Sequence, residues 1–407
     1  MHSYNGLFDN MLSEASMDIA FHDASKGKTK RNDVQKVLRN LEDKTSKKGK
    51  VVKGEKTRLK EILKDEKLIL YHHETCRINE VNCHKERDIV KPFFKYEQVV
   101  HHLVVGQLKP IVMKGFYEYS CGSIPNRGCH YGKKYIEKWI RSYPKDKTVY
   151  VLKMDIKHFF ENVDHDILKN KLARVIRDKK FLRLVYKIID NHEVGLPLGY
   201  YTSQWFANFY LKDFDHYVKE VLKAPHYMRY MDDMVIISDN KEQLHLIRQE
   251  IEEYLNNELN VELKDNWQVF PLAEDSYNKE LTKEQYAGRP LDFMGFKFYR
   301  THTTMRKSIL CRARHKANRI YSKQRVTWRD ATAMISYMGW ITHTDTYMYF
   351  QKYIKPKVTI STLKWRVSKH NRKENKRNDR LEASKRNTDN KTFRGRYLFQ
   401  YQNCLLA

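Results

Sequence analysis

The sequence predicts an α+β fold, and three observations lead to this class. Two short runs, 148–155 and 226–238, are rich in β-branched and apolar residues, which is typical of buried strands. Over 195–220 the apolar residues recur at helical spacing, and beyond Arg306 the chain becomes basic, aromatic and helical in pattern. With 407 residues, of which 41% are hydrophobic, the chain is long enough for two or three modules and too apolar to be disordered.

The charge balance indicates a polyanionic partner. Lys and Arg number 77 against 50 Asp and Glu, which gives a net charge of +27. Such an excess favours nucleic acid, because neutralising each phosphate releases counterions; a basic protein without such a partner is the alternative. The segment 26–60 holds 14 Lys and Arg, and 364–386 holds ten. We expect the first to contact RNA or to form a solvated face, and the second to be disordered or ordered by RNA.

The sequence carries no sign of secretion or of a membrane anchor. Its polar N-terminus is unlike a signal peptide, and no run approaches the ~18 apolar residues that span a bilayer. Six cysteines form no CxxC pair and match no zinc-site spacing. We therefore expect a reduced, cytoplasmic location and no membrane partner.

The first candidate for catalysis is Asp155, at the end of the strand predicted for 148–155. The strand is apolar, so the carboxylate would stand where the chain leaves the core. An unpaired carboxylate there is costly unless it binds a metal ion or another cation. An aspartate at a strand end is also common without any function, so this position alone does not decide between the two.

The second candidate is the acidic pair Asp232-Asp233, which two apolar runs flank within 226–238. This pattern predicts a β-hairpin with both carboxylates at its turn, although aspartate also suits a turn without function. Adjacent like charges beside hydrophobic strands repel, and a divalent ion would relieve the conflict. Three carboxylates on neighbouring strands can hold two Mg²⁺ ions about 3.5–4 Å apart. One ion would activate a primer 3′-hydroxyl, and the other would hold a nucleoside triphosphate.

The segments MDIKHFFENVDHDIL (154–168) and YMDD (230–233) resemble two motifs of reverse transcriptases of the bacterial, group-II-intron-like kind. The resemblance implies a right-hand polymerase fold, with fingers, a palm built on an antiparallel sheet, and a helical thumb. It also implies that Asp155 and Asp232 bind both Mg²⁺ ions and that Asp233 supports them.

The same resemblance indicates residues around the incoming nucleotide. Phe160, five residues after the first aspartate, would be the steric gate that excludes a ribonucleotide 2′-hydroxyl; a core phenylalanine is the alternative. The family motif QGxxxSP reads LGYYTSQ here, so Leu198, Gly199 and Gln204 are expected at the nucleotide. Leu198 cannot donate a hydrogen bond, which predicts low fidelity. An aliphatic residue combined with SQ resembles the enzymes of diversity-generating retroelements and of defence-associated bacterial lineages.

The fingers are expected upstream of these motifs. CGSIPNRGCHYGKKYIEKWI (121–140) resembles the segment that carries a triphosphate-binding arginine, which is Arg127 here. A guanidinium suits this role because it can bind phosphate through two parallel hydrogen bonds. Arg87 is a second candidate.

The primer grip and the thumb are expected downstream. LDFMGFKFYR (291–300) resembles the primer grip, and the family lysine between palm and grip has Lys264 as its nearest counterpart. Three residues of the grip would form a hairpin against the primer end: Phe293, Gly295 and Phe296. Three basic residues of the thumb helices would follow the backbone of the duplex: Arg312, Arg314 and Lys316.

We predict five parts of the chain from these motifs and from the charge pattern. They are an N-terminal basic helical extension (1–64), fingers (65–147), a palm (148–300) with a fingers insertion at 170–195, a helical thumb (301–363) and a basic C-terminal tail (364–407).

The predicted function is that of an RNA-directed DNA polymerase. It would copy a structured, cognate non-coding RNA with dNTPs and two Mg²⁺ ions, forming an RNA/DNA duplex, and a homo-oligomer is compatible with this role. Anti-phage defence is the expected biological role, and a diversity-generating retroelement is the alternative. A catalytically idle RNA-binding scaffold is the alternative from another class, and an RNA-dependent RNA polymerase is a further rival. The three intact carboxylates argue against the scaffold, and Phe160 argues against the RNA polymerase.

Overall fold

The computed structural model describes residues 3–46, 49–71, 73, 75–80, 85–274 and 288–388. The chain divides into two compact units, Met1–His302 (unit 1) and Thr303–Ala407 (unit 2). Unit 1 combines helices with β-sheets, and unit 2 is mainly helical, in agreement with the predicted α+β class. Among the described residues, no helix is both long and apolar enough to cross a membrane.

Unit 1 begins with helices that pack into its main core. Apolar side chains of α2, among them Met17 and Phe21, are buried, and α2 packs against the long helix α5. The basic segment that follows is held in place by Lys56, whose buried ammonium pairs with Asp18 and Glu42. The elements are α1 (Leu7–Met11), α2 (Glu14–Ser25), α3 (Asn32–Arg39), β1 (Lys44–Thr45), β2 (Val51–Val52) and α4 (Glu55–Lys64).

The region predicted as fingers contains a hairpin and a long helix in its first part. β3 (Thr75–Glu80) and β4 (Lys85–Val90) pair in antiparallel fashion. A kinked turn, η1 (Phe94–Gln98), leads into α5 (Val99–Val112), and η2 (Met113–Gly115) follows it. Most of the buried residues of α5 are aliphatic, so this helix forms a central part of the core.

A five-stranded sheet in the order β5-β7-β8-β6-β9 forms the centre of unit 1. β6 (Tyr150–Asp155) lies antiparallel between β8 (Asp233–Ser238) and β9 (Gln268–Pro271), and β7 (His226–Tyr230) joins β8 through a tight turn. The strands predicted within 148–155 and 226–238 are thereby confirmed. β5 (Ser120–Cys121) runs parallel to β7, so the sheet begins before the predicted start of the palm at residue 148.

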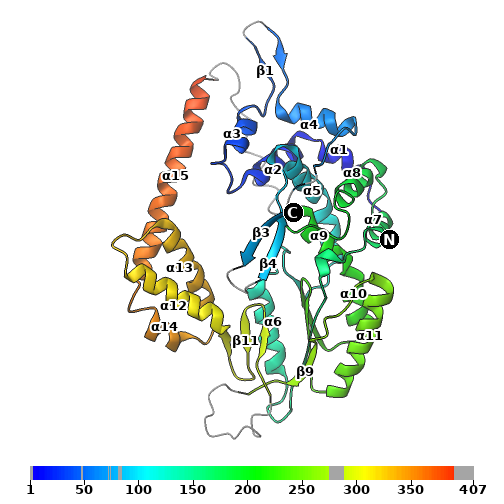
Figure 1. The fold of residues 1–407 in the computed structure, drawn as a ribbon, viewed down its shortest axis with the longest axis vertical. Helices are drawn as coiled ribbons and strands as arrows, with labels where there is room; N and C mark the ends of the chain where they lie inside the picture. The colour runs from blue at the N-terminus through cyan, green and yellow to red at the C-terminus, as the bar shows by residue number, and fades with distance from the viewer. Residues whose placement is uncertain are drawn as a thin grey trace. The chain divides into compact units, whose positions relative to one another are not determined.

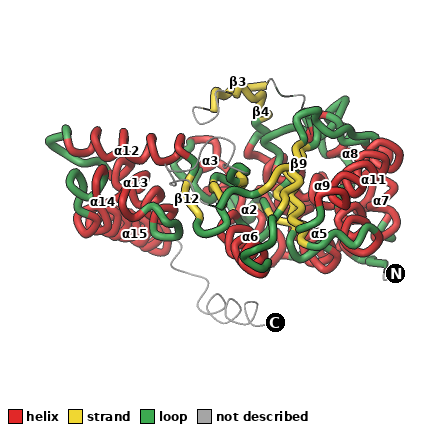
Figure 2. The backbone as a smooth tube through the Cα atoms, turned by 90° about the horizontal axis from the view of Figure 1, so that it is seen from below, coloured by secondary structure: helices red, strands yellow, loops and turns green. Residues whose placement is uncertain are grey.

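Helices flank the sheet on both sides (Figures 1 and 2). α6 (Cys129–Ser142) lies on one side, and α11 (Lys241–Leu259) lies on the other with a buried stripe that includes Ile247 and Ile251. The helix predicted over 195–220 is divided into pieces, because the backbone leaves helical geometry at Leu211. The remaining helices of this part are α7 (His165–Val175), α8 (Lys179–Ile189), α9 (Tyr201–Tyr210), α10 (Lys212–His216) and η4 (Tyr217–Val221).

Unit 2 has a hydrophobic core of its own, to which Ala313, Met334 and Ile354 belong. Thr327 and Asp330 form a reciprocal capping box at the start of its second helix. The last helix runs through 364–386, where the sequence predicted disorder or ordering by RNA; the segment lacks Gly and Pro and is rich in residues that favour helices. The described elements are β12 (Thr303–Met305), α12 (Lys307–Tyr321), α13 (Trp328–Ile341), α14 (Tyr347–Tyr353) and α15 (Ile360–Thr388).

Candidate active site

Three carboxylates meet at one edge of the central sheet. Asp155, the last residue of β6, is the cross-strand partner of Asp233, the first residue of β8, and Asp232 stands in the turn just before it. Met231 takes the left-handed backbone conformation in this turn, with φ 57°. The amide of Ile156 donates to the carbonyl of Asp232 at 3.3 Å, which joins the turn to the end of β6. The acidic residues predicted from two distant motifs are therefore neighbours in space.

The negative charge at this edge is crowded. Burial, together with the Asp155 and Asp233 carboxylates, raises the pKa of Asp232 to about 6. Asp155 Oδ2 forms an ion pair with Lys264, which follows α11. Among the described residues, Asp155 Oδ1 finds no hydrogen-bond partner although it is buried. A buried oxygen without a donor is unfavourable, so the cluster is short of positive charge.

The chemistry of this cluster fits divalent cations. Carboxylate oxygens are the ligands that Mg²⁺ prefers in proteins, and a bound cation would relieve both the buried Oδ1 of Asp155 and the raised pKa of Asp232. Within the described part of the chain, no group of three His, Cys, Asp or Glu side chains is close enough together to enclose an ion as it stands. The ammonium of Lys264 contacts Oδ2 of Asp155, an oxygen that a bound cation would also use.

A buried ion pair supports the turn 231–232 between β7 and β8, which we call the acidic turn. The sequence analysis did not identify this ion pair. Arg229 of β7 is fully buried and donates through Nε and Nη2 to Asp215 of α10, at 2.7 and 2.5 Å. Its Nη1 donates to the carbonyl of Met231 at 2.9 Å and to the side-chain oxygen of Asn208 at 3.2 Å. One guanidinium thus joins the turn to α9 and α10. The available signal was an arginine inside the apolar strand HYMRY, since a buried arginine requires a partner.

The partners of Arg229 are themselves fixed by hydrogen bonds. Asp215 accepts from Ser120 Oγ at 2.6 Å and from the hydroxyl of Tyr227 at 2.8 Å. Asn208 Nδ2 donates to the carbonyl of Gly122 at 3.2 Å, just after β5. The turn that carries Asp232 is therefore held by the sheet and by two helices.

The loop 195–199 brings several of the predicted nucleotide residues together. A Cβ atom on Gly195 (φ 68°) would lie 2.4 Å from the carbonyl oxygen of Phe160, and one on Gly199 (φ 112°) would lie 2.1 Å from that of Val90. Only glycine fits such approaches at positive φ. The amide of Val90 also donates to the carbonyl of Leu198 at 2.7 Å. The loop therefore connects Phe160 with the end of β4, while the contacts of these residues with a nucleotide stay a prediction.

Two further predicted positions flank this loop. Phe160 lies in η3 (Phe159–Glu161), where its half-buried ring packs edge-on against Phe159 at 5.7 Å between centroids. Gln204 is exposed on α9 and, together with Gly199, lines a cavity at the start of that helix.

Arg127 has a partner within the protein. Its guanidinium donates to the carbonyl of Tyr117 at 2.8 Å, and its backbone closes a turn with Gly122 and Ile124. Arg127 follows β5, the edge strand beside β7. Arg87, the second candidate, lies on β4 opposite Ile78. The triphosphate-binding role of Arg127 stays a prediction.

The hairpin predicted as the primer grip is present as β10 (Leu291–Phe293) and β11 (Phe296–Phe298). Met294 and Gly295 both have positive φ, as a two-residue hairpin turn requires. The rings of Phe293 and Phe296 are buried, so a primer would meet the turn and not these rings. Lys153 of β6 donates to a β10 carbonyl at 2.8 Å, which links the hairpin to the strand of Asp155.

The three basic residues predicted to follow the duplex lie on α12, and two of them contact side chains within unit 2. Lys316 pairs with Asp330 at 2.7 Å, and the guanidinium of Arg314 lies over the ring of Tyr353 at 4.5 Å. Arg312 is half-buried, and its Nε and Nη1 have no hydrogen-bond partner among the described residues. Arg314 is exposed, and a contact between these three residues and nucleic acid stays a prediction.

Known proteins resemble this chain over part of its length. Protein YkfC of Escherichia coli (strain K12) is 22% identical over 262 residues, which cover 53% of this chain and 68% of YkfC. The group II intron-encoded protein LtrA of Lactococcus lactis subsp. cremoris is 27% identical over 177 residues, covering 40% of this chain and 28% of LtrA. A telomerase structure from Candida tropicalis, solved with a fragment of telomeric RNA, covers 78% of this chain and 62% of its own, with 11% identity and a TM-score of 0.44. The chain thus spans less than two thirds of LtrA and of the telomerase.

A family comparison covers the region that holds the three carboxylates. The model of the family described as reverse transcriptase (RNA-dependent DNA polymerase) matches residues 83–298, more than half of the chain. This range contains the acidic edge, the loop 195–199 and the β10–β11 hairpin. The chain therefore belongs to the reverse transcriptase family of RNA-directed DNA polymerases, and its fold is the right-hand polymerase fold.

Proposed function

We propose that this reverse transcriptase copies a structured, cognate non-coding RNA into DNA by two-metal nucleotidyl transfer. The observation that carries the proposal is the crowding of Asp155, Asp232 and Asp233 at one edge of the sheet, with the pKa of Asp232 raised to about 6 by burial and by its two neighbours. Such a cluster requires a compensating cation. Two Mg²⁺ ions, when bound, supply this charge and stabilise the attacking and leaving oxygens of the reaction.

The chain's own residues prepare the site for these ions. Asp155 and Asp232 would hold both ions, with Asp233 beside them. Lys264 neutralises Asp155 in their place, and it would release Oδ2 when a divalent ion takes that oxygen. Arg229 holds the backbone of the turn through the Met231 carbonyl, so binding of the ions would require movement of the carboxylate side chains and not of the turn. Preorganised charge of this kind lowers the barrier, because the site does not have to reorient during the reaction.

Phe160 would select the sugar of the incoming nucleotide. Its ring packs against Phe159, and the close approach of Gly195 fixes its backbone. A bulky ring at this position would clash with a 2′-hydroxyl, which would favour dNTPs over ribonucleotides. Leu198 offers no side-chain donor to the nucleotide, so we expect low fidelity.

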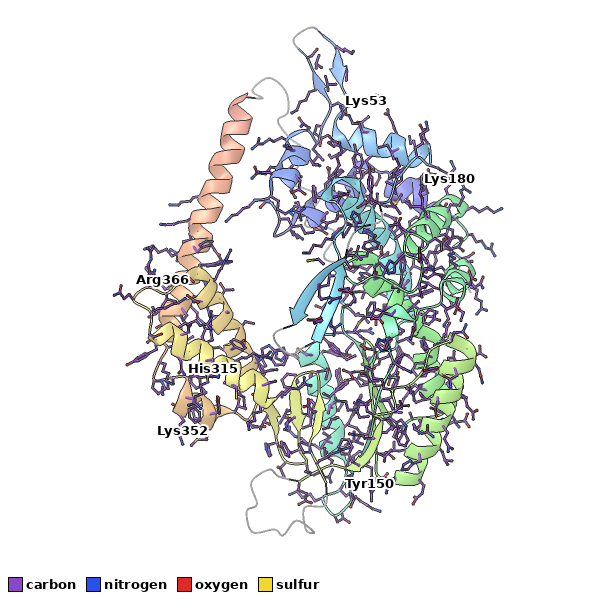
Figure 3. All side chains as sticks on the ribbon, in the orientation of Figure 1. Lys53, Tyr150, Lys180, His315, Lys352 and Arg366 are labelled. Atoms are coloured by element: carbon purple, nitrogen blue, oxygen red, sulfur yellow. The ribbon has the colours of Figure 1, made fainter. Side chains whose placement is uncertain are left out.

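The RNA partner would be bound largely through charge. The net charge of +27 predicts a steep loss of affinity as the salt concentration rises. Exposed lysines lie on both units, among them Lys53 and Lys180 on unit 1 and Lys352 on unit 2 (Figure 3). Sequencing the RNA that purifies with the protein tests whether the partner is cognate. One enriched, structured RNA supports this part of the proposal, and a random sample of cellular transcripts contradicts it.

For the biological role we propose anti-phage defence, and a diversity-generating retroelement is the alternative. The motif LGYYTSQ around Leu198 resembles both groups, and the basic N-terminal region resembles the defence lineages more closely. Phage plaque counts on cells with the wild-type protein or with Asp232→Ala test the first role. Unchanged counts across a broad panel would exclude defence, and a template/variable repeat pair beside the gene would favour diversification.

Primer extension on an RNA template with Mg²⁺ and dNTPs tests the reaction itself. Wild-type protein should extend the primer, and Asp232→Ala should retain less than about 1% of the rate, because the ions contribute several kcal/mol. Asp239→Ala, an exposed aspartate beyond the far end of β8, is the matched control and should keep full activity. RNA binding should be equal in all three proteins. A larger residual rate in Asp232→Ala contradicts the two-metal assignment, and a wild type that binds RNA without extending primers indicates an idle scaffold.

A further inference from the structure

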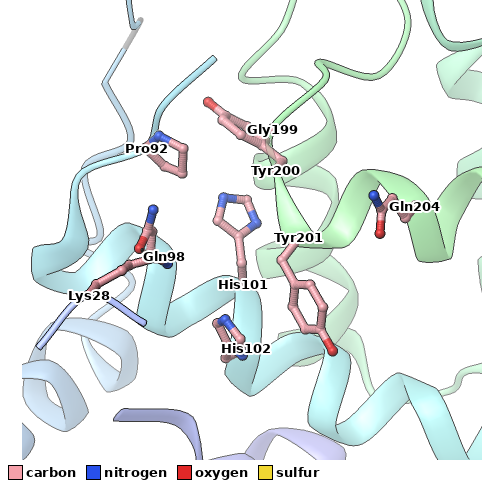
Figure 4. A pocket seen from close by; sticks show the side chains of 9 residues that line it. All are labelled: Lys28, Pro92, Gln98, His101, His102, Gly199, Tyr200, Tyr201 and Gln204. Atoms are coloured by element: carbon pink, nitrogen blue, oxygen red, sulfur yellow. Dashed lines mark hydrogen bonds between the residues drawn. The ribbon is translucent and has the colours of Figure 1, made fainter. Parts of the chain in front are cut away.

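A cavity of about 260 Å³ lies at the start of α9 in unit 1 (Figure 4). Side chains from three separate segments meet there: Lys28 after α2, Gln98 of η1 with His101 and His102 of α5, and Tyr201 and Gln204 of α9. In Figure 4, Lys28 and Gln98 form one side, Tyr201 faces them from the other, and His101 and His102 lie between. No part of the proposed reaction uses these side chains except Gln204.

An aromatic pair forms one wall of this cavity. The rings of His102 and Tyr201 are stacked, with 4.3 Å between centroids and 18° between planes. Tyr201 is nevertheless 39% exposed, although it is large and aromatic. A partly open stack of this kind can accept another flat ring, as in proteins that bind single-stranded nucleic acid.

The lining of the cavity is almost uncharged. Burial lowers the pKa of His101 to about 3, and burial together with Lys28 lowers that of His102 to about 4, so both imidazoles are neutral at physiological pH. His101 Nδ1 lies 3.0 Å from the hydroxyl of Thr202. The ammonium of Lys28 donates to the carbonyl of Ala24 at 3.1 Å and to Gln98 Oε1 at 2.8 Å. Neutral rings and amides with one nearby ammonium suit a nucleobase attached to a phosphate backbone.

The cavity is connected to the acidic turn by α9 itself. Asn208 Nδ2 donates to the carbonyl of Gln204 at 3.1 Å and contacts the sulfur of Met231 at 3.5 Å. Tyr201 precedes Asn208 by seven residues, which is about 10 Å along a helix. Bases stacked at about 3.4 Å along a strand would cover this distance in roughly three steps.

Exposed rings continue beyond the cavity. Pro92 lines it, and the next residue, Phe93, is 55% exposed. Phe93 lies edge-on to Tyr71, which is 52% exposed, with 5.5 Å between their centroids. Asn191 joins the two places, because its Nδ2 lies 3.2 Å from both the Tyr71 carbonyl and the Tyr200 hydroxyl. A single strand that leaves the cavity would therefore meet further surfaces for base stacking.

We propose that the cavity holds an unpaired base of the template strand, about three nucleotides ahead of the acidic turn, against the stacked rings of Tyr201 and His102. The proposal rests on the proposed function, since it presumes that a template enters the site. If the cavity binds such a base, the affinity for a primer–template duplex depends on the length of the unpaired template overhang. A template with several unpaired nucleotides binds tightly, and one with a single unpaired nucleotide leaves the cavity empty.

Fluorescence anisotropy with primer–template duplexes tests this directly. The probes carry 5′ template overhangs of one or six nucleotides, and in a second series one abasic site moves through the longer overhang. Wild-type protein should bind the longer overhang about tenfold more tightly, the contribution expected of one stacked base. One abasic position near the third nucleotide should remove most of this advantage. Tyr201→Ala and His102→Ala should remove it as well and become insensitive to the abasic site, whereas Tyr201→Phe should keep it.

Controls separate this proposal from misfolding and from the proposed function. Tyr217→Ala removes a tyrosine that stacks on Tyr254 at 4.5 Å, between η4 and α11, and should keep the overhang preference. Tyr201→Ala should extend a template with a one-nucleotide overhang at the wild-type rate, which shows that the variant is folded.

If no protein extends any template, the proposed function fails, while the overhang preference is still measured by binding. An equal preference in wild type and Tyr201→Ala, or no single sensitive abasic position, overturns the proposal. So does displacement of the overhang by micromolar adenosine monophosphate, which would indicate a site for free nucleotides.

Discussion

The two ends of α9 lie in opposite chemical surroundings. Toward the C-terminal end, Asn208 contacts the acidic turn, where Asp232 and its neighbours crowd together and a buried guanidinium holds the backbone. At the N-terminal end, Tyr201 stacks on an uncharged imidazole beside a cavity. Charged side chains are therefore concentrated at the C-terminal end of α9, where phosphates would react. Neutral rings lie at its N-terminal end, where a base would bind. The comparison indicates that catalysis and strand binding can be disrupted separately, although a single helix carries residues of both.

The strongest way to disturb only the charged end is to remove Arg229. Arg229→Met leaves Asp215 buried without its cation, and breaking a buried pair costs about 3–5 kcal/mol. We expect at least a tenfold slower primer extension and a lower melting temperature, while the preference for long overhangs remains. Arg229→Lys keeps the charge but not the forked hydrogen bonds, and should be intermediate.

A positional role of Arg229 is distinguished from a purely structural one by Mg²⁺ titration. The Mg²⁺ concentration that gives the half-maximal rate should rise in Arg229→Met, because the Met231 carbonyl loses its donor beside Asp232. The double variant Arg229→Met/Asp215→Leu replaces the pair by apolar groups and should recover stability more than rate. An unchanged Mg²⁺ requirement in a folded Arg229→Met protein would show that the ion pair only stabilises the fold.

Phe160 sharpens the comparison, because it lies beside the loop 195–199 and its proposed action depends on shape and not on charge. Phe160→Ala should raise the use of ribonucleotides relative to dNTPs by roughly tenfold to a hundredfold, which is the discrimination that an apolar site provides against one added hydroxyl. Competition between the two nucleotide types in primer extension measures this ratio. Phe160→Tyr keeps the bulk and should stay selective. A ratio that is the same in Phe160→Ala and wild type would assign the gate to another residue.

The smallest expected effect is on the stability of the metal-free protein. Asp232 ionises at a pKa of about 6 in the folded state and near 4 in an unfolded chain, so its charge destabilises the fold above about pH 6. Asp232→Asn should therefore be more stable than wild type at pH 7.5 without Mg²⁺, by an amount on the order of 1–3 kcal/mol. The gain should shrink as the pH falls through 6 toward 4. Thermal melts in EDTA at several pH values measure it; a variant less stable than wild type at pH 7.5 would contradict the crowding of the carboxylates.

The sequence predicts those parts of the site whose residues form a recognisable pattern within one short stretch of the chain. The strand ending at Asp155 and the hairpin around Asp232 were predictable, because charges inside short apolar runs are visible in a window of a dozen residues. The β10–β11 hairpin was predicted as well, but the burial of Phe293 and the paired state of Arg314 depend on what packs against them.

Contacts between distant segments could not be predicted in this way. The cavity combines Lys28 with residues more than 170 positions later, and no pattern in the sequence connects them. Arg229 was visible as an arginine in an apolar strand, but its partner Asp215 lies on a helix, so only the tertiary structure identifies the pair. The resemblance to reverse transcriptases provided what local patterns could not, namely that Asp155 and Asp232 belong to one site.

One paired measurement tests the central claim that the two ends of α9 separate chemistry from strand binding. Primer-extension rate on a one-nucleotide overhang and affinity for a six-nucleotide overhang are measured for wild type, Asp232→Ala and Tyr201→Ala. The account predicts that Asp232→Ala loses the rate, to below about 1%, and keeps the affinity, whereas Tyr201→Ala keeps the rate and loses about tenfold in affinity. If each variant loses both properties together, or if Asp232→Ala still extends the primer, the two ends do not act separately and the account is wrong.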